Sequence, residues 1–338
     1  MAVGMRIERW DPADEKTTLA CHEIHRAANE VDEGVEPPMS AGTFAMFLAE
    51  GFDCDPGEAW LARDDDGAVV GFYRLTLPSL ENLDRAFLHP VVHPVARRRG
   101  IGRELLRHGA RRAAASSRTL LEAFAAEDSA GDEFARVVGG TLAIEEVRRI
   151  QYLSKIAPGT VARLRSAAAS AAAGYSLVSW TGPVPEEYLG AVAEVFGAYN
   201  DAPHAECVED EVWDANRVRE RTGKLERAGL MRAYTVAAIH DATGDMAGFT
   251  AVLVDPEAPE WGFQQLTAVV RTHRGHRLGL LLKTAMLDLL AEAEPQLDRI
   301  ATGNAAANEH MIAVNEQLGY EVVKPGWRFY EMPAANVR

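Results

Sequence analysis

The sequence predicts an α+β protein built from two tandem copies of one fold, each a mixed, mostly antiparallel sheet flanked by helices. Each half opens with a short strand that ends at a Trp and is soon followed by Pro, at 6–12 and 175–183. Each half then has two apolar runs around an Asp/Gly turn, at 59–77 and 232–254. That pattern is typical of a β-hairpin. The repeated order predicts two copies of one fold.

The repeat keeps nearly one spacing along the chain. Gly71-Phe72 recurs as Gly248-Phe249, and the offset is 248 − 71 = 177 residues. An apolar strand, a basic glycine-containing loop and a Leu-rich helix follow at 86–113 and again at 263–290. A helix that ends in Gly before a strand comes next, at 137–147 and 317–323, and Gly is the usual residue just after a helix.

The boundary between the copies is expected near residues 155–174. This segment has a Pro-Gly turn and then an Ala-rich stretch, and Ala favours helix. We expect a helical or semi-rigid connector. The predicted division is a first domain at 1–155, a linker at 156–174 and a second domain at 175–338.

Composition excludes several classes of protein. The 338 residues suit two domains, and the net charge of −15 disfavours binding to a nucleic-acid phosphate backbone. No apolar run reaches the ~20 residues of a membrane span, and no apolar leader is visible. The cysteines, Cys21, Cys54 and Cys207, are too dispersed for a metal or redox pair. We expect a cytoplasmic protein without a metal, and leave open whether it is a monomer or a homodimer.

The basic loops carry the clearest chemical signal. Arg97–Gly102 reads RRRGIG between a strand and a helix, where backbone N–H groups and the helix dipole attract an anion. No Lys follows Gly102, which excludes a P-loop, and the third Gly of a dinucleotide fingerprint is missing. A phosphate or pyrophosphate remains, and the alternative is a solvated basic helix face.

These loops resemble the pyrophosphate loop of the GNAT superfamily, the acyl-CoA-dependent N-acetyltransferases, once per half, as in tandem two-domain actinobacterial members. The resemblance implies acetyl-CoA or another acyl-CoA as co-substrate, with the backbone of each splayed strand also binding it. The second loop departs at Arg277, where the middle glycine usually stands. The implied residues are Val91, Val92, Arg97, Arg98, Arg99, Gly100, Ile101 and Gly102 in the first half, and Val269, Val270, Arg274, Gly275, His276, Arg277, Leu278, Gly279 and the helix-starting Asn308 in the second.

The resemblance also implies side chains for proton transfer. Many members carry a Glu on the splayed strand and a Tyr in the last helix. Here the candidates are Glu260 as base, Gln265 as a water-holding group, Asn315 at the usual Tyr position, and Tyr330 as thiol acid. The alternative for Glu260 is an exposed turn residue, and for Tyr330 a packed aromatic. In the first half only His89 is available.

The acceptor is expected to be a small-molecule primary amine. The acidic segments 26–39 and 199–213 match loops that line the acceptor site in this fold, and an acidic rim attracts a cationic amine. Solvated loops are the alternative. We expect the second half to catalyse transfer. The alternatives are a non-catalytic CoA-binding or sensing protein and a protein N-acetyltransferase.

Overall fold

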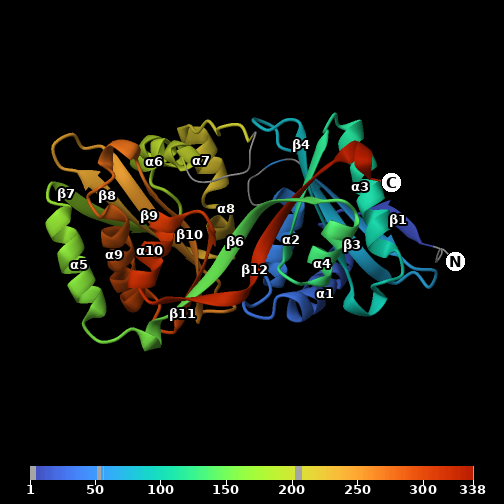
Figure 1. Ribbon diagram of the computed structural model, residues 1–338, viewed down its shortest axis with the longest axis horizontal. Helices are drawn as coiled ribbons and strands as arrows, with labels where there is room; N and C mark the ends of the chain where they lie inside the picture. Colours follow the sequence, from blue (N-terminus) through green and yellow to red (C-terminus); the bar gives the residue numbers. More distant parts are fainter. Residues whose placement is uncertain (1–4, 52–54, 56, 202–207, 338) are drawn as a thin grey trace. The chain divides into compact units, whose positions relative to one another are not determined.

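The computed structural model divides the chain into two compact units (Figure 1). It describes residues 5–51, 55, 57–201 and 208–337. The first unit comprises Met1–Glu146, Ala205–Glu209 and Lys324–Arg338, and the second comprises Val147–His204 and Asp210–Val323. Each unit has a mixed sheet in which one strand pair is parallel, with helices on both faces. The predicted fold class is confirmed.

The first unit has the strand order β1-β2-β3-β4-β5-β12. Its α1 and α2 begin at Asp14 and Ser40, whose side chains accept hydrogen bonds from the first turn. Those helices cover one face of the sheet, and α3 with α4 covers the other. Its elements are β1 (Arg6–Arg9), α1 (Glu15–Asp32), α2 (Ala41–Glu50), β2 (Gly57–Arg63), β3 (Val69–Thr76), β4 (Arg85–Val92), α3 (Ile101–Ala115), β5 (Leu120–Ala126) and α4 (Ala130–Val137), with the beginning of β6 (Thr141–Tyr152) and the end of β12 (Tyr320–Pro333).

The second unit repeats this plan with the order β6-β11-β10-β9-β8-β7. One face packs α9 and α10 in a core of leucines, and α6 with α7 covers the other. Its elements are α5 (Thr160–Ala171), β7 (Tyr175–Thr181), α6 (Leu189–Gly197), α7 (Ala215–Arg221), α8 (Lys224–Arg227), β8 (Arg232–His240), β9 (Met246–Val254), β10 (Trp261–Val269), α9 (Leu278–Ala293), β11 (Arg299–Ala305) and α10 (Glu309–Gln317).

The two units are not simply the first and second halves of the chain, because β6 and β12 each pass from one unit to the other. The first unit ends within β6 at Glu146, and the rest of β6 belongs to the second unit. The chain returns within β12, whose residues 327–333 pair with β5 of the first unit. The segment expected as a linker contains α5, whose Leu164 and Ala168 are buried in the second unit's core. Arg165 also donates to the carbonyl of Thr284 in α9, at 3.1 Å.

A buried carboxylate holds the end of β12 in the first unit. Asp132 of α4 is 0% exposed and accepts hydrogen bonds from the Tyr330 hydroxyl, from Arg328 at 2.7 Å and from Arg136 at 2.8 Å. Burial by itself would raise the pKa of Asp132. These hydrogen bonds, with one from the Asp128 N–H, instead hold it below the ordinary value.

A buried lysine lies in the second unit. Lys283 of α9 is 4% exposed, and its Nζ lies 4.9 Å from the ring centroid of Tyr320. Among the described residues it makes no ion pair. Burial therefore lowers the pKa of Lys283 to about 7, because the charged ammonium is poorly solvated there.

Replacing Tyr330 by Phe should destabilise the protein by ~1–3 kcal/mol, because the buried Asp132 loses a donor. Urea unfolding measures this loss, with Tyr152→Phe as the control for a tyrosine near the end of β6. Equal stability of Tyr330→Phe and wild type would show that the Asp132 hydrogen bond does not hold β12.

Replacing Lys283 by Met should stabilise the protein most at low pH. Between about pH 7 and about pH 10.5 the unfolded chain binds the Lys283 proton and the folded chain does not, so wild-type stability rises with pH there. Below that range the folded protein bears the whole cost of a buried charge. We expect Lys283→Met to gain ~1–3 kcal/mol near pH ~6 and less near pH ~9. Urea unfolding at the two pH values tests this, with the exposed Lys16→Met as control, and a gain that grows with pH would contradict it.

Candidate functional site

Each unit has a pair of parallel strands that part after a short paired stretch. β4 pairs with β5 only through Arg85–Phe87, and β10 pairs with β11 only through Trp261–Phe263. Beyond these residues β4 and β10 remain paired only on their other edge, with β3 and β9. Each unit therefore has an opening in its sheet beside the strand that leads into a basic loop.

The two openings differ in the strand that borders them. β10 has a β-bulge between Gln264 and Thr267, whereas the register of β4 against β3 is unbroken. The Gln264 amide secures the bulge by donating to the carbonyls of Ala251 at 2.7 Å and Leu266 at 3.2 Å. The bulge exposes Gln265. β4 instead has Pro90, which carries no N–H to donate.

The two basic loops share one backbone shape although their glycines differ. In the first loop Arg98 and Gly100 are left-handed, with φ of 64° and 88°. In the second, Gly275 and Arg277 are left-handed at the corresponding positions, with φ of 89° and 56°. Arg277 thus takes the conformation of Gly100. Neither α3 nor α9 has a side-chain cap at its N-terminus, so backbone N–H groups there can bind an anion.

The first arginine of each loop braces the loop. Arg97 donates to the Val92 carbonyl at 3.2 Å and to both carboxylate oxygens of Asp32 at 2.8 and 2.6 Å. Arg274 donates to the Val269 carbonyl at 3.1 Å and to Asp201 at 2.8 Å. Both aspartates lie in the acidic segments at 26–39 and 199–213, which the sequence analysis expected to line the acceptor site and did not connect to these arginines. Residues 202–207 of the second acidic segment lie outside the described residues.

Some of the other expected cofactor-binding residues are buried and others are exposed. Ile101 and Leu278 are buried and anchor the helix starts, and Val91 is buried in the core beneath α1. The Val270 N–H is already bonded to the Ala247 carbonyl. Gly279 has nothing within 4 Å of where a Cβ would stand, whereas Gly102 faces Phe134 and Val92. The loop side chains of Arg98, Arg99, His276 and Arg277 are exposed, as is that of Arg274, which pairs with Asp201.

Aromatic side chains fill one face of the opening in the first unit. His89 of β4 stacks on Phe124 of β5 with ring centroids 4.4 Å apart, and Phe124 contacts Trp327 and Phe329 of β12. His89 shares the face of Val91, which packs beneath α1 and α2. Burial lowers the pKa of His89 to about 4, so it is neutral at physiological pH. In the second unit, Gly303 stands at the position of Phe124, counted from the equivalent strand pairs.

The structure separates the expected proton-transfer residues. Glu260 lies in an exposed turn before β10, and its carbonyl accepts from the N–H groups of Asp298 and Arg299 at 3.0 and 3.1 Å. It is therefore at the end where β10 and β11 are still paired, about 20 Å of strand away from Leu266. Tyr330 is in the first unit and not the second, because β12 crosses there, and burial raises its pKa to about 12.

The second unit keeps Gln265 and two asparagines of α10. Asn308 caps this helix, accepting from the Met311 N–H at 3.2 Å. Asn315 is fully buried, and its Nδ2 donates to Asn304 Oδ1 of β11 at 2.8 Å. The Oδ1 atom of Asn315 finds no hydrogen-bond partner in the described part of the chain.

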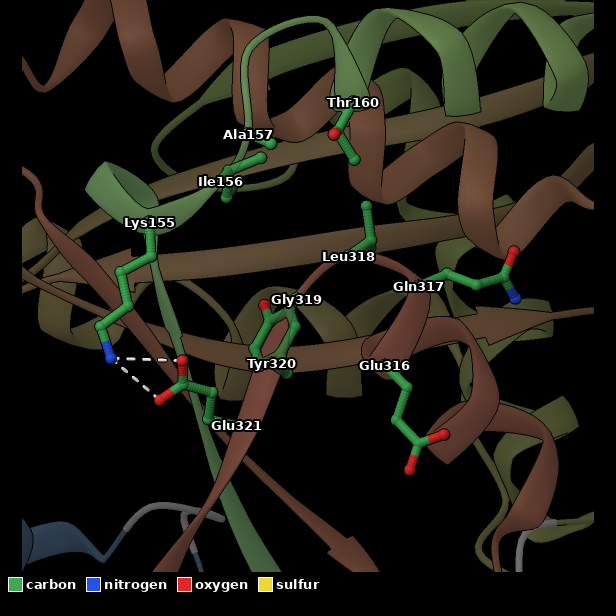
Figure 2. A pocket seen from close by; sticks show the side chains of 10 residues that line it. All are labelled: Lys155, Ile156, Ala157, Thr160, Glu316, Gln317, Leu318, Gly319, Tyr320 and Glu321. Atoms are coloured by element: carbon green, nitrogen blue, oxygen red, sulfur yellow. Dashed lines mark hydrogen bonds and ion pairs between the residues drawn. The ribbon is translucent and has the colours of Figure 1, made fainter.

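A separate pocket of about 290 Å³ lies at the other end of α10 (Figure 2). Leu318, Gly319 and the inward-pointing hydroxyl of Tyr320 form part of its wall. At its edge, the Lys155 ammonium pairs with the Glu321 carboxylate at 3.0 and 3.2 Å. None of the expected site residues lines this pocket.

Within the described part of the chain, no helix is long and apolar enough to cross a membrane. The same residues contain no group of three or more His, Cys, Asp or Glu side chains placed to hold a metal ion.

Comparisons with known proteins agree with this geometry. The acetyltransferase (GNAT) domain family matches residues 55–134. Mycothiol acetyltransferase of Mycolicibacterium paratuberculosis is 28% identical over 284 residues, 80% of each chain. Among solved structures, a tandem GNAT protein from the clavulanic acid biosynthesis pathway is 30% identical, with a TM-score of 0.80 over 98% of this chain and 99% of that one. A GCN5-related N-acetyltransferase from Sphaerobacter thermophilus shares the fold at 16% identity, with a TM-score of 0.67 over 98% and 96% of the two chains.

The repeated sheets, the paired loops and a 30% identical tandem relative that matches over nearly the whole chain lead to one assignment. This chain belongs to the GNAT acetyltransferase superfamily and is of its tandem two-domain type.

Proposed function

We propose that the protein transfers an acetyl group from acetyl-CoA to a primary amine of a small molecule, and that the second unit performs the transfer. The observation that carries the proposal is the opening between β10 and β11, with its bulged strand leading to an uncapped helix N-terminus. The family resemblance assigns such an opening to the pantetheine arm and such a loop to the pyrophosphate.

The second loop fits a pyrophosphate. Free N–H groups at the start of α9 and the exposed side chains of His276 and Arg277 offer donors to phosphate oxygens. The open space beside Gly279 lets the ligand approach the helix closely. Arg274 supports this arrangement indirectly by bracing the loop on Val269 and Asp201.

The first unit is the less suitable place for an acceptor. Its aromatic cluster of His89, Phe124, Trp327 and Phe329 occupies the sheet face on which the family binds the acceptor, whereas the second unit has Gly303 in place of Phe124. The exposed Gln265 at the bulge is placed to hold a water that takes the amine proton. This arrangement supports a binding role for the first loop without transfer.

Titration calorimetry with acetyl-CoA, together with a transfer assay on a panel of amines, tests the assignment. Gly279→Glu puts bulk and negative charge against the second loop, and we expect its unit to bind at least ~10-fold more weakly and transfer to be lost. Gly102→Glu is the matched change in the first unit, and transfer should survive it. Gly→Ala at each position controls for the loss of glycine.

The opposite pattern, with transfer lost only in Gly102→Glu, would assign the reaction to the first unit. Failure of the wild type to bind acetyl-CoA would overturn the proposal. Binding without transfer to any amine would instead favour the CoA-sensing alternative.

A further inference from the structure

The second unit contains buried polar atoms that lack partners. Arg149 of β6 is 5% exposed, and neither its Nε nor its Nη1 has a hydrogen-bond partner among the residues that the structure describes. Asn315 of α10 is 0% exposed, and its Oδ1 is likewise unpaired within the described ranges. Leaving such groups unsatisfied costs free energy, most of all for a charged one. Their presence therefore indicates a ligand that satisfies them.

The strand register places Arg149 opposite α10. One hydrogen bond aligns the two units. The Leu153 N–H donates to the Asp298 carbonyl just before β11, and the Ala334 N–H donates to the Thr119 carbonyl just before β5, so Leu153 and Ala334 are equivalent. Arg149 and Tyr330, four residues before them, are therefore equivalent too. Side chains alternate along a strand, so Arg149 shares the face of Gln151, which donates to the carbonyl of Leu318 at the end of α10, at 2.8 Å.

The equivalent place in the first unit is satisfied or apolar. Tyr330 bonds there to Asp132, beside Ala123 of β5. Leu120 of β5 and Arg299 of β11 are equivalent, so Thr302 and Asn304 of β11 stand where β5 has Ala123 and Ala125. The helices end at the equivalent Gly139 and Gly319, which makes Asn315 the counterpart of Ala135. The second unit thus has a polar layer, Arg149, Thr302, Asn304 and Asn315, in place of Tyr330, Ala123, Ala125 and Ala135.

This polar layer borders the opening. Ala301 is the last residue of β11 paired with β10, and Thr302 and Asn304 follow on the free stretch. Within the layer, the Asn315 side chain donates a hydrogen bond to the Asn304 side chain. Arg149 lies on β6, one strand spacing of about 4.8 Å beyond β11, a distance that an extended arginine side chain spans to reach a ligand between β10 and β11.

We propose that Arg149, with Asn315 beside it, receives the sulfur of CoA as a thiolate when the acetyl group is transferred. The inference rests on the function proposed above. The amine nitrogen bonds to the acetyl carbon, the carbon–sulfur bond breaks, and its electron pair goes to sulfur. The amine proton passes to water, and the released thiolate later takes a proton from water.

The guanidinium suits this role because it stays charged. Arginine is not deprotonated in proteins, so it stabilises an anion by charge and by N–H donors and does not protonate it. A neighbouring cation lowers the pKa of a thiol. The chain therefore needs no tyrosine at position 315, and Tyr330 in the first unit is not required as the acid.

The thiol pKa of bound CoA is the direct test, read from the ultraviolet absorbance of the thiolate across pH. Every protein carries Gly102→Glu, so that the signal comes from the second unit. We expect binding to lower the CoA thiol pKa by about one unit or more. Arg149→Met should return it to the value of free CoA, and Arg149→Lys should retain part of the shift. The exposed Arg163→Met is the matched control. An equal thiol pKa with and without Arg149 would overturn the inference.

A second measurement separates this role from a structural one. Because the unpaired N–H groups of Arg149 make no hydrogen bonds to lose, Arg149→Met should melt no lower than wild type without CoA. Adding Asn315→Tyr to Arg149→Met should restore part of kcat and give it a fall at alkaline pH as the tyrosine ionises. If Arg149→Met melts at a lower temperature and Asn315→Tyr does not restore kcat, Arg149 has a structural role and the inference is wrong. If CoA does not bind at all, the proposed function fails; if it binds with an unshifted thiol, only the inference fails.

Discussion

The opening in each unit depends on one constraint, the need of β5 and β11 for a hydrogen-bonded neighbour on the edge away from the opening. A buried strand edge must find hydrogen-bond partners, and in each unit the last strand of the other half supplies them. β12 completes the first sheet beside β5, and the end of β6 lies beside β11 in the second. Each half of the sequence therefore contributes side chains to the other half's unit. Tyr330 and Arg149 occupy equivalent positions for this reason, and neither belongs to the unit that its place in the sequence suggests.

The two units keep the same backbone and have diverged in what lines it. Both have a short parallel pair, a braced basic loop and an uncapped helix N-terminus. Beside the opening, the first unit has stacked aromatic rings and a hydrogen-bonded Tyr330, whereas the second has a bulge, a glycine and buried polar groups. Packed rings and satisfied hydrogen bonds favour a fixed structure. Unsatisfied polar groups favour a bound ligand, and this difference between the units supports the proposal that transfer takes place in the second unit.

The two basic loops adopt the same backbone conformation with different residue types. Gly100 and Arg277 have the same left-handed conformation, and so do Arg98 and Gly275. A non-glycine residue has a steric cost there, and in each loop the first arginine braces the chain, Arg97 on Asp32 and Arg274 on Asp201. The departure from the family pattern at Arg277 consequently leaves the loop backbone unchanged.

Local chemistry in the sequence determined the repeat, the hairpins, the helix-ending glycines and the two basic loops, because each depends on residues close together in the chain. The same local information placed Asn308 as a helix cap and Asn315 in the last helix. Strand partnership is set by edges that meet only in the folded chain, so only the tertiary structure decided that Tyr330 joins the first unit and Arg149 the second. It also placed Glu260 at the closed end of its strand pair, since the point at which β10 and β11 part depends on their packing and not on either strand alone.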